Sequence, residues 1–189
     1  MDLDLYNDTY DIFCNAIKVP HAKILEIGCG PGNITKYLLS KRPDLEIEAI
    51  DMAPNMIALA KVNNPTASFK VMDAREIDNI TQQFDGIMCG FCLPYLSKED
   101  CAKLINDCSG LLENNGILYL SAIEDVYEKS AMETSSDGQH SMFVYCHEAD
   151  YLQEMLQNNG FELTDMIRKH YPKSDGTSAT HLICLAKKI

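Results

Sequence analysis

The stretch Ile24-Leu-Glu-Ile-Gly-Cys-Gly-Pro-Gly-Asn-Ile-Thr35 decides the fold of this chain. An apolar strand that contains Glu26 runs into Gly28, Gly30 and Gly32, and a helical pattern follows. Glycine is needed where the backbone adopts unusual dihedral angles or approaches a ligand without an intervening Cβ. An ordinary glycine-rich turn would account for one or two of these glycines, but not for three at alternate positions. The stretch therefore predicts a strand–turn–helix unit that presents bare backbone to a small molecule.

The spacing of the glycines distinguishes between cofactors. Dinucleotide-binding loops read Gly-x-Gly-x-x-Gly, whereas this chain reads Gly28-x-Gly30-x-Gly32 and carries Glu26 within the strand. The pattern Glu-x-Gly-x-Gly-x-Gly resembles the signature of class I S-adenosylmethionine-dependent methyltransferases, and the resemblance extends from about Lys23 to the C-terminus. It implies that the loop holds the methionyl end of S-adenosyl-L-methionine, whose product is S-adenosyl-L-homocysteine.

Two further acids end strand-like runs. Asp51 ends the run from Glu46, about twenty residues beyond the glycines, a spacing suited to binding ribose hydroxyls. An ionised carboxylate accepts several hydrogen bonds, so a vicinal diol is a suitable partner. Asp73 ends the run from Phe69, and the resemblance implies that it receives the adenine amino group. The alternative is that Asp73 only caps a turn, as Asp commonly does.

The expected cofactor contacts lie on the glycine loop, after the next strands and on the N-terminal helix. They are Glu26, Gly28, Cys29, Gly30, Gly32, Asn33, Asp51, Met52, Met56, Asp73, Ala74, Arg75, Gly90 and Tyr10.

Composition is typical of a single compact enzyme domain. The 189 residues are 46% hydrophobic, and no run of about eighteen apolar residues is present to span a membrane. The acidic start, Met1-Asp-Leu-Asp4, lacks the basic region of a signal peptide, which favours a cytoplasmic location. The formal charge of −12 disfavours a nucleic-acid substrate, because phosphate backbones require basic surface. Partners are therefore expected to be small molecules, with neither nucleic acid nor membrane, and the oligomeric state stays open.

The eight cysteines are scattered through strand and helix patterns, which favours buried thiols over disulfides. Cys89-Gly-Phe-Cys92 is the one Cys-x-x-Cys pair, and this spacing also occurs in redox and zinc sites. A structural zinc site needs four ligands at paired spacings, which the sequence does not supply. We therefore expect no metal.

Short apolar strands alternate with amphipathic helices along most of the chain. Asp8 to Asp11 reads as an N-terminal capping box, Pro31 suits a first helical turn, and Asn114-Asn-Gly116 reads as a turn before a strand over 117–123. This alternation predicts an α/β, doubly wound, mostly parallel sheet covered on both faces. The runs 161–170 and 181–188 have no helix between them and should pair antiparallel. The resemblance implies seven strands in the order 3-2-1-4-5-7-6.

One domain is expected over residues 1–189, with two segments covering the ligand side. The N-terminal helix, residues 1–20, is predicted to form part of a lid, with Tyr6 and Tyr10 at its frayed end free to reach the ligand. Residues 124–147 are predicted to be an insertion that covers the substrate side, and their centre, Thr134 to His140, is a polar loop by composition. A disordered surface insertion is the alternative for this segment.

The resemblance implies methyl transfer to a small-molecule acceptor by in-line displacement at the sulfonium methyl. Such chemistry needs walls that align the acceptor and, for a weakly acidic acceptor, a base. The candidate walls are Gly90, Phe91, Leu93, Pro94, Tyr95, Tyr6 and Tyr10, and the candidate catalytic residues are His140, His147, Tyr145 and Tyr95. Two alternatives stay open, a nicotinamide-dependent oxidoreductase and a non-catalytic S-adenosylmethionine-binding partner protein.

Overall fold

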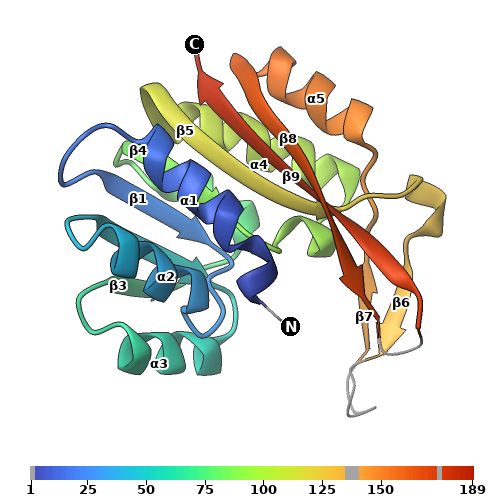
Figure 1. The fold of residues 1–189 in the computed structure, drawn as a ribbon, viewed down its shortest axis with the longest axis horizontal. Coiled ribbons are helices and arrows are strands. Elements are labelled where there is room, and N and C mark those ends of the chain that lie inside the picture. The colour runs from blue at the N-terminus through green and yellow to red at the C-terminus, as the bar shows by residue number, and fades with distance from the viewer. Residues whose placement is uncertain (1–2, 135–140, 174–175) are drawn as a thin grey trace.

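The computed structural model describes residues 3–134, 141–173 and 176–189, so the candidate His140 lies outside the described residues. Seven strands form one sheet in the order β3-β2-β1-β4-β5-β9-β8 (Figure 1). The first five strands run parallel and β9 is antiparallel to both of its neighbours. Their bounds are β1 Lys23–Ile27, β2 Glu46–Asp51, β3 Ser68–Val71, β4 Phe84–Cys89, β5 Leu112–Ile123, β8 Phe161–Pro172 and β9 Ser178–Lys188. Because β6 and β7 form a separate sheet, β8 and β9 take the sixth and seventh places, and the predicted fold and order are confirmed.

Helices cover both faces of the sheet because each presents an apolar stripe to it. One core joins the first three helices to β1, β2, β4, β5 and β9, and a second core joins the last two helices to the opposite face. Figure 1 shows α1, α2 and α3 in front of the sheet and α4 and α5 behind it. The bounds are α1 Asn7–Ala16, α2 Asn33–Lys41, α3 Pro54–Asn63, α4 Lys98–Leu111 and α5 Ala149–Asn158. Among the described residues, no helix is long and apolar enough to cross a membrane.

Three predicted element ends are wrong. A 3-10 turn, η1 (Leu3–Tyr6), leads directly into α1, so Tyr6 takes the cap position without a side-chain cap bond and no capping box forms. Gly32, at φ 82°, precedes α2, so Pro31 lies outside the helix. The strand expected over 117–123 begins at Leu112, ahead of the expected turn at 114–116, where Asn115 has a positive φ of 67° and the register with β4 shifts between Leu112 and Ile117.

The segment after β5 contains a short hairpin that the sequence analysis did not predict. β6 (Ala131–Thr134) and β7 (Ser141–Val144) pair antiparallel, with Met132 opposite Phe143. Cross-strand pairs of large side chains stabilise such a hairpin, a contribution that polar composition alone does not reveal. The hairpin extends past the end of the main sheet (Figure 1). The centre of the segment, residues 135–140, lies outside the described residues.

Candidate functional site

The glycine loop between β1 and α2 adopts the conformation that its sequence predicts. Gly28, Gly30 and Gly32 all have positive φ, at 71°, 53° and 82°, a region that side chains with a Cβ rarely adopt. The amides of Gly28 and Cys29 donate to the carbonyl of Ile50, at 2.9 and 3.0 Å, which fastens the loop to the end of β2.

Two of the glycines serve different purposes. A Cβ at Gly28 would lie 3.1 Å from Cys92 Cβ, so this position permits close packing against the turn after β4. A Cβ at Gly30 would meet no atom within 4 Å. Gly30 therefore borders open space, where a ligand can approach the backbone.

Asp51 links the loop to the start of α3. Its Oδ2 accepts the Gly30 amide and its Oδ1 accepts the Ala53 amide, both at 2.8 Å. Each carboxylate oxygen can accept more than one hydrogen bond, so both retain capacity for a ligand. Among the other predicted contacts near this strand end, Asn33 and Met52 are exposed and Met56 is half-buried.

Glu26 is buried in β1 directly behind the loop. Its Oε2 accepts the Thr35 hydroxyl at 2.5 Å, whereas Oε1 has no hydrogen-bond partner among the described residues. Burial raises the pKa of the Glu26 carboxyl to about 7, against an opposing contribution from the Thr35 hydrogen bond. A buried acceptor without a donor is costly, so Glu26 needs a donor that the described part of the chain does not provide.

Tyr10 provides a second buried polar atom without a partner. Its hydroxyl makes no hydrogen bond among the described residues, and burial, followed by the nearby Tyr119 and Glu26, raises its pKa. Tyr10 is a predicted cofactor residue, and it lies close enough to Glu26 for their charges to interact.

The expectation of a frayed N-terminal end is wrong. Tyr6 and Tyr10 are 0% and 1% exposed, because both pack against residues far along the chain. The Tyr6 ring contacts Phe91 at 4.8 Å between centroids, and the Tyr10 ring contacts Tyr119 at 5.7 Å. These rings therefore belong to the core between α1 and the sheet.

Asp73 caps the turn that follows β3. Its Oδ1 accepts the Arg75 amide at 2.9 Å, and its carboxylate pairs with the Arg75 guanidinium at 3.1 Å. Arg75 is held further by Asp100. Ala74, which lies between Asp73 and Arg75 in the sequence, is half-buried. The capping role weighed from the sequence is thus present, and the adenine role stays a prediction.

A pocket of about 560 Å³ opens beyond the carboxyl ends of β4 and β5. Three of the predicted walls line it, Phe91, Pro94 and Tyr95, whereas Leu93 is buried in the core and Gly90 packs against α2. The end of β5, the β6–β7 hairpin and the adjoining ends of β8 and β9 supply the other lining residues, which are Ala122, Ile123, Glu133, Thr134, Val144, Tyr171, Pro172, Lys173, Ala179 and His181. We call this space the acceptor pocket.

The catalytic candidates are not gathered in this pocket. Tyr95 lines it and is 48% exposed, but neither His147 nor Tyr145 is among its lining residues. His147 is buried, with Nε2 3.1 Å from the Leu93 carbonyl and its ring stacked on Tyr151. Tyr145 stacks on Tyr127. Both belong to an aromatic cluster between β7 and α5, where their role is packing.

His181, which the sequence analysis missed, does line the acceptor pocket. It lies in the apolar run of β9, where no motif marks it. The only usable signal was its position at the start of the last strand, which antiparallel pairing brings to the ligand side of the sheet.

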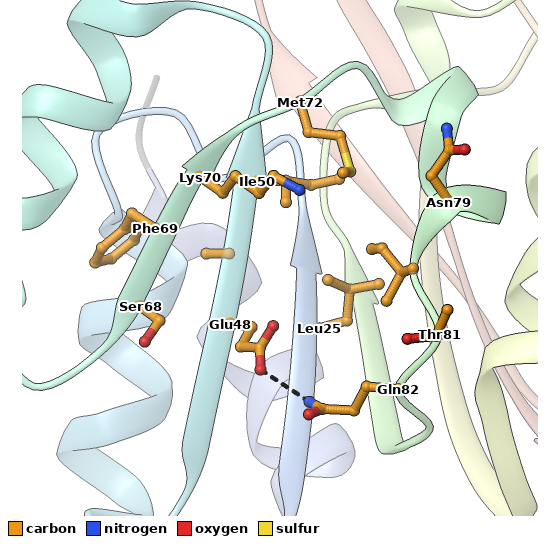
Figure 2. A pocket seen from close by; sticks show the side chains of 12 residues that line it. Leu25, Glu48, Ile50, Ser68, Phe69, Lys70, Met72, Asn79, Thr81 and Gln82 are labelled. Atoms are coloured by element: carbon orange, nitrogen blue, oxygen red, sulfur yellow. Dashed lines mark hydrogen bonds between the residues drawn. The ribbon is translucent and has the colours of Figure 1, made fainter.

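A second hollow, of about 320 Å³, lies over β2 and β3 and contains none of the predicted residues. Figure 2 shows it between the strands and the segment before β4, with Gln82 donating to Glu48 at 2.8 Å. It exists because the connection from β3 to β4 contains only a 3-10 turn, η2 (Ala74–Asn79), which leaves part of that sheet face uncovered.

All eight cysteines are free and buried, which agrees with the prediction of buried thiols. Within the described ranges, no cluster of three or more His, Cys, Asp or Glu side chains could hold a metal ion.

Residues 24–116 match a protein family described as a methyltransferase domain. The chain is 33% identical over 100 residues to a malonyl-[acyl-carrier protein] O-methyltransferase of Acetivibrio thermocellus, which covers 52% of this chain and 34% of that protein. The malonyl-[acyl-carrier protein] O-methyltransferase of a Paenibacillus species is 34% identical over 140 residues. That alignment covers 64% of this chain and 50% of the Paenibacillus protein. The chain thus spans half or less of the length of these curated relatives.

Solved structures share the fold over nearly the whole chain. A S-adenosylmethionine-dependent methyltransferase of Methanosarcina mazei superposes with a TM-score of 0.78 at 19% identity, covering 93% of this chain and 96% of its own. Magnesium protoporphyrin IX methyltransferase of Synechocystis, solved with bound S-adenosylmethionine, gives a TM-score of 0.71 at 15% identity, covering 98% and 81%.

Proposed function

We propose that the chain is a class I S-adenosylmethionine-dependent methyltransferase that transfers the methyl group of S-adenosylmethionine to a small-molecule acceptor. The match of residues 24–116 to a methyltransferase domain and the similar methyltransferases support this proposal and favour it over the nicotinamide-dependent alternative. The chain spans only part of its curated relatives, so the identity of the acceptor is not carried over from them.

The observation that carries the proposal is the pair of unpartnered buried polar atoms behind the glycine loop. Among the described residues, neither Glu26 Oε1 nor the Tyr10 hydroxyl has a hydrogen-bond partner, although both are buried. The Gly30 backbone in the neighbouring loop borders open space, because a Cβ added there would meet no atom within 4 Å. A ligand with an ammonium and a carboxylate group, such as the methionyl end of the cofactor, offers a donor to Glu26 and an acceptor to Tyr10. The residues present therefore fit the cofactor.

When bound, S-adenosylmethionine supplies a sulfonium-bound methyl group that is open to in-line displacement by a nucleophile. The residues of the chain then have three tasks: binding, alignment and exclusion of water. Asp51 binds the ribose hydroxyls, Asp73 and the backbone after it bind the adenine, and the glycine loop with Glu26 and Tyr10 binds the methionyl end. Tyr6 and Phe91 form a wall between the loop and the acceptor pocket.

The acceptor pocket suits a small, partly apolar molecule. Its lining is mostly aromatic and aliphatic, with a few polar groups that can orient a ligand. The β6–β7 hairpin, within residues 124–147, contributes to the lining of this side, and we propose that the N-terminal segment, within residues 1–20, adds to the cover. The net charge of −12 disfavours nucleic acid, and we propose a cytoplasmic enzyme without a membrane partner.

Calorimetric titration with S-adenosylmethionine, S-adenosylhomocysteine and NADH tests the proposal. We expect the first two ligands to bind and NADH not to bind. Asp51→Ala should weaken S-adenosylhomocysteine binding by about ten- to a hundredfold, since charge-assisted hydrogen bonds contribute roughly 1.5–3 kcal/mol. Asp85→Ala is the matched control, because Asp85 also accepts a backbone amide, that of Lys23, but at the opposite end of the sheet. Equal losses in the two variants would contradict the ribose assignment.

A further inference from the structure

We propose that His181 is a catalytic residue whose Nε2 accepts the proton of a hydroxyl group on a small aromatic acceptor bound in the acceptor pocket. The inference rests on the proposed function and adds to it the chemical class of the acceptor and the base.

The position of His181 leaves one ring nitrogen held and the other available. Nδ1 lies 2.6 Å from the Tyr6 hydroxyl, whereas Nε2 makes no hydrogen bond among the described residues. The His181 side chain lines the acceptor pocket. When Nδ1–H donates to the Tyr6 oxygen, the lone pair of the neutral imidazole is on Nε2, and the same hydrogen bond persists after Nε2 is protonated.

Aromatic neighbours hold the ring in place. Tyr171 stacks on it at 5.4 Å with an interplanar angle of 6°, and Phe91 packs edge-on at 5.9 Å. Tyr171 and Phe91 also line the acceptor pocket, as does Tyr95. Such rings favour an aromatic ligand through stacked and edge-to-face contacts, which would place its hydroxyl beside the base.

The charged groups around His181 favour its neutral form. Burial first, and then the charge of Lys173, lower the pKa of the imidazole. Lys173 lies 3.6 Å from Glu133, which offsets part of its charge, and Lys169, opposite His181 in β8, is paired with Asp8 at 2.6 Å. The tyrosines at positions 6 and 171 are the other titratable neighbours. Near pH 7 the ring is therefore ready to accept a proton.

A base is needed because a phenol, with a pKa near that of tyrosine at about 10, is almost entirely protonated near pH 7. In the step, the acceptor oxygen forms a bond to the methyl carbon with its electron pair. The pair of the carbon–sulfur bond goes to sulfur, which leaves neutral S-adenosylhomocysteine. The hydroxyl proton passes to Nε2 of His181, and from there to water after the product leaves.

Chemical modification of the unaltered protein tests the availability of Nε2 without any acceptor. Diethyl pyrocarbonate acylates neutral, accessible imidazole nitrogens, and tandem mass spectrometry locates the adduct. We expect His181 to react in the folded protein. His147 is the matched control, since its Nε2 is bonded and its Nδ1 is buried, and it should react only after unfolding. A His181 as unreactive as His147 would overturn the proposal.

Methyl transfer from tritiated S-adenosylmethionine to phenol and to 4-nitrophenol, at about pH 8, tests the proton transfer. 4-Nitrophenol ionises without help at this pH, whereas phenol does not. His181→Gln should lower the rate with phenol by about 100- to 10,000-fold and leave the rate with 4-nitrophenol within about tenfold. Tyr6→Phe, which removes only the hydroxyl beside Nδ1, should give a smaller loss that is again confined to phenol.

The outcomes separate this inference from the proposed function. Equal losses with both phenols, or methylation of neither phenol by the unaltered protein, would overturn the role of His181. Failure of the unaltered protein to bind S-adenosylhomocysteine would instead contradict the proposed function. Binding of S-adenosylhomocysteine to the His181→Gln variant with unchanged affinity shows that the variant is folded, and if it is not folded, the result with Tyr6→Phe decides.

Discussion

At the scale of single residues, two buried polar groups near the glycine loop lack hydrogen-bond partners among the described residues. Glu26 and Tyr10 each have a buried oxygen that makes no hydrogen bond to any other described residue, although each such group lowers the stability of the protein without its ligand. Binding sites commonly carry this kind of cost, because the ligand supplies the missing partner. The same two residues therefore govern both stability and affinity.

Glu26 should make the stability of the ligand-free protein fall as pH rises. Its pKa is raised from 4.5 to about 7, so the folded state binds the proton more tightly than the unfolded state. The contribution is fully present below about pH 4.5 and is lost as pH rises toward 7, a change on the order of 3 kcal/mol at about 1.4 kcal/mol per pKa unit. Glu26→Gln should lack this change. Urea unfolding of both proteins at several pH values measures it, and parallel pH profiles would show that Glu26 does not titrate in this range.

Tyr10→Phe should stabilise the ligand-free protein while weakening cofactor binding. The variant removes a buried hydroxyl without a partner, so we expect a gain of about 1 kcal/mol in the free energy of unfolding. Tyr6→Phe is the matched control, since it removes a hydroxyl bonded to His181 and should lose a similar amount. Denaturant unfolding gives the stabilities and calorimetry the affinities for S-adenosylhomocysteine. A Tyr10→Phe variant that binds as tightly as the unaltered protein would remove Tyr10 from the cofactor site.

At the scale of elements, η1 and the start of α1 are part of the core. Tyr6 is fully buried against Phe91, in the turn after β4, and against His181 in β9. We expect Tyr6→Ala to lower the free energy of unfolding by about 3–5 kcal/mol, as truncation of a large buried ring does. The control is Asn7→Ala, since the Asn7 side chain makes one exposed hydrogen bond. Similar unfolding midpoints for the two variants would show that the segment is a detachable cover.

The elements also show which properties the sequence can predict. The glycine loop, the strands and Asp51 were predictable because glycine spacing and strand endings are local signals. The burial of Tyr6 depends on a partner 175 positions away, and the role of His181 depends on antiparallel pairing of β9 with β5. The β6–β7 hairpin was missed because its stability comes from cross-strand pairs, not from composition. Non-local contacts therefore account for the errors.

At the scale of the whole molecule, the glycine-loop end of the sheet and the hollow of Figure 2 are competing positions for the cofactor, and hydrogen exchange distinguishes them. Binding of S-adenosylhomocysteine should slow amide exchange at 26–33, 51–56 and 73–75, because these segments converge at the carboxyl ends of β1, β2 and β3. Exchange at 7–12 should also slow, since Tyr10 gains a partner.

Residues 79–83 are the internal control, because 79–82 border the hollow in Figure 2, whose lining contains no residue of the glycine loop. Their exchange should not change with S-adenosylhomocysteine, and NADH should change neither region. Mass spectrometry of peptides from the protein with and without each ligand gives both results in one experiment. Protection confined to 79–83 would move the ligand to the second hollow. Protection of the glycine loop together with the strand ends would instead place the cofactor at the carboxyl ends of β1, β2 and β3. Its methionyl part would then lie near Glu26, and its adenosyl part near Asp51 and Asp73.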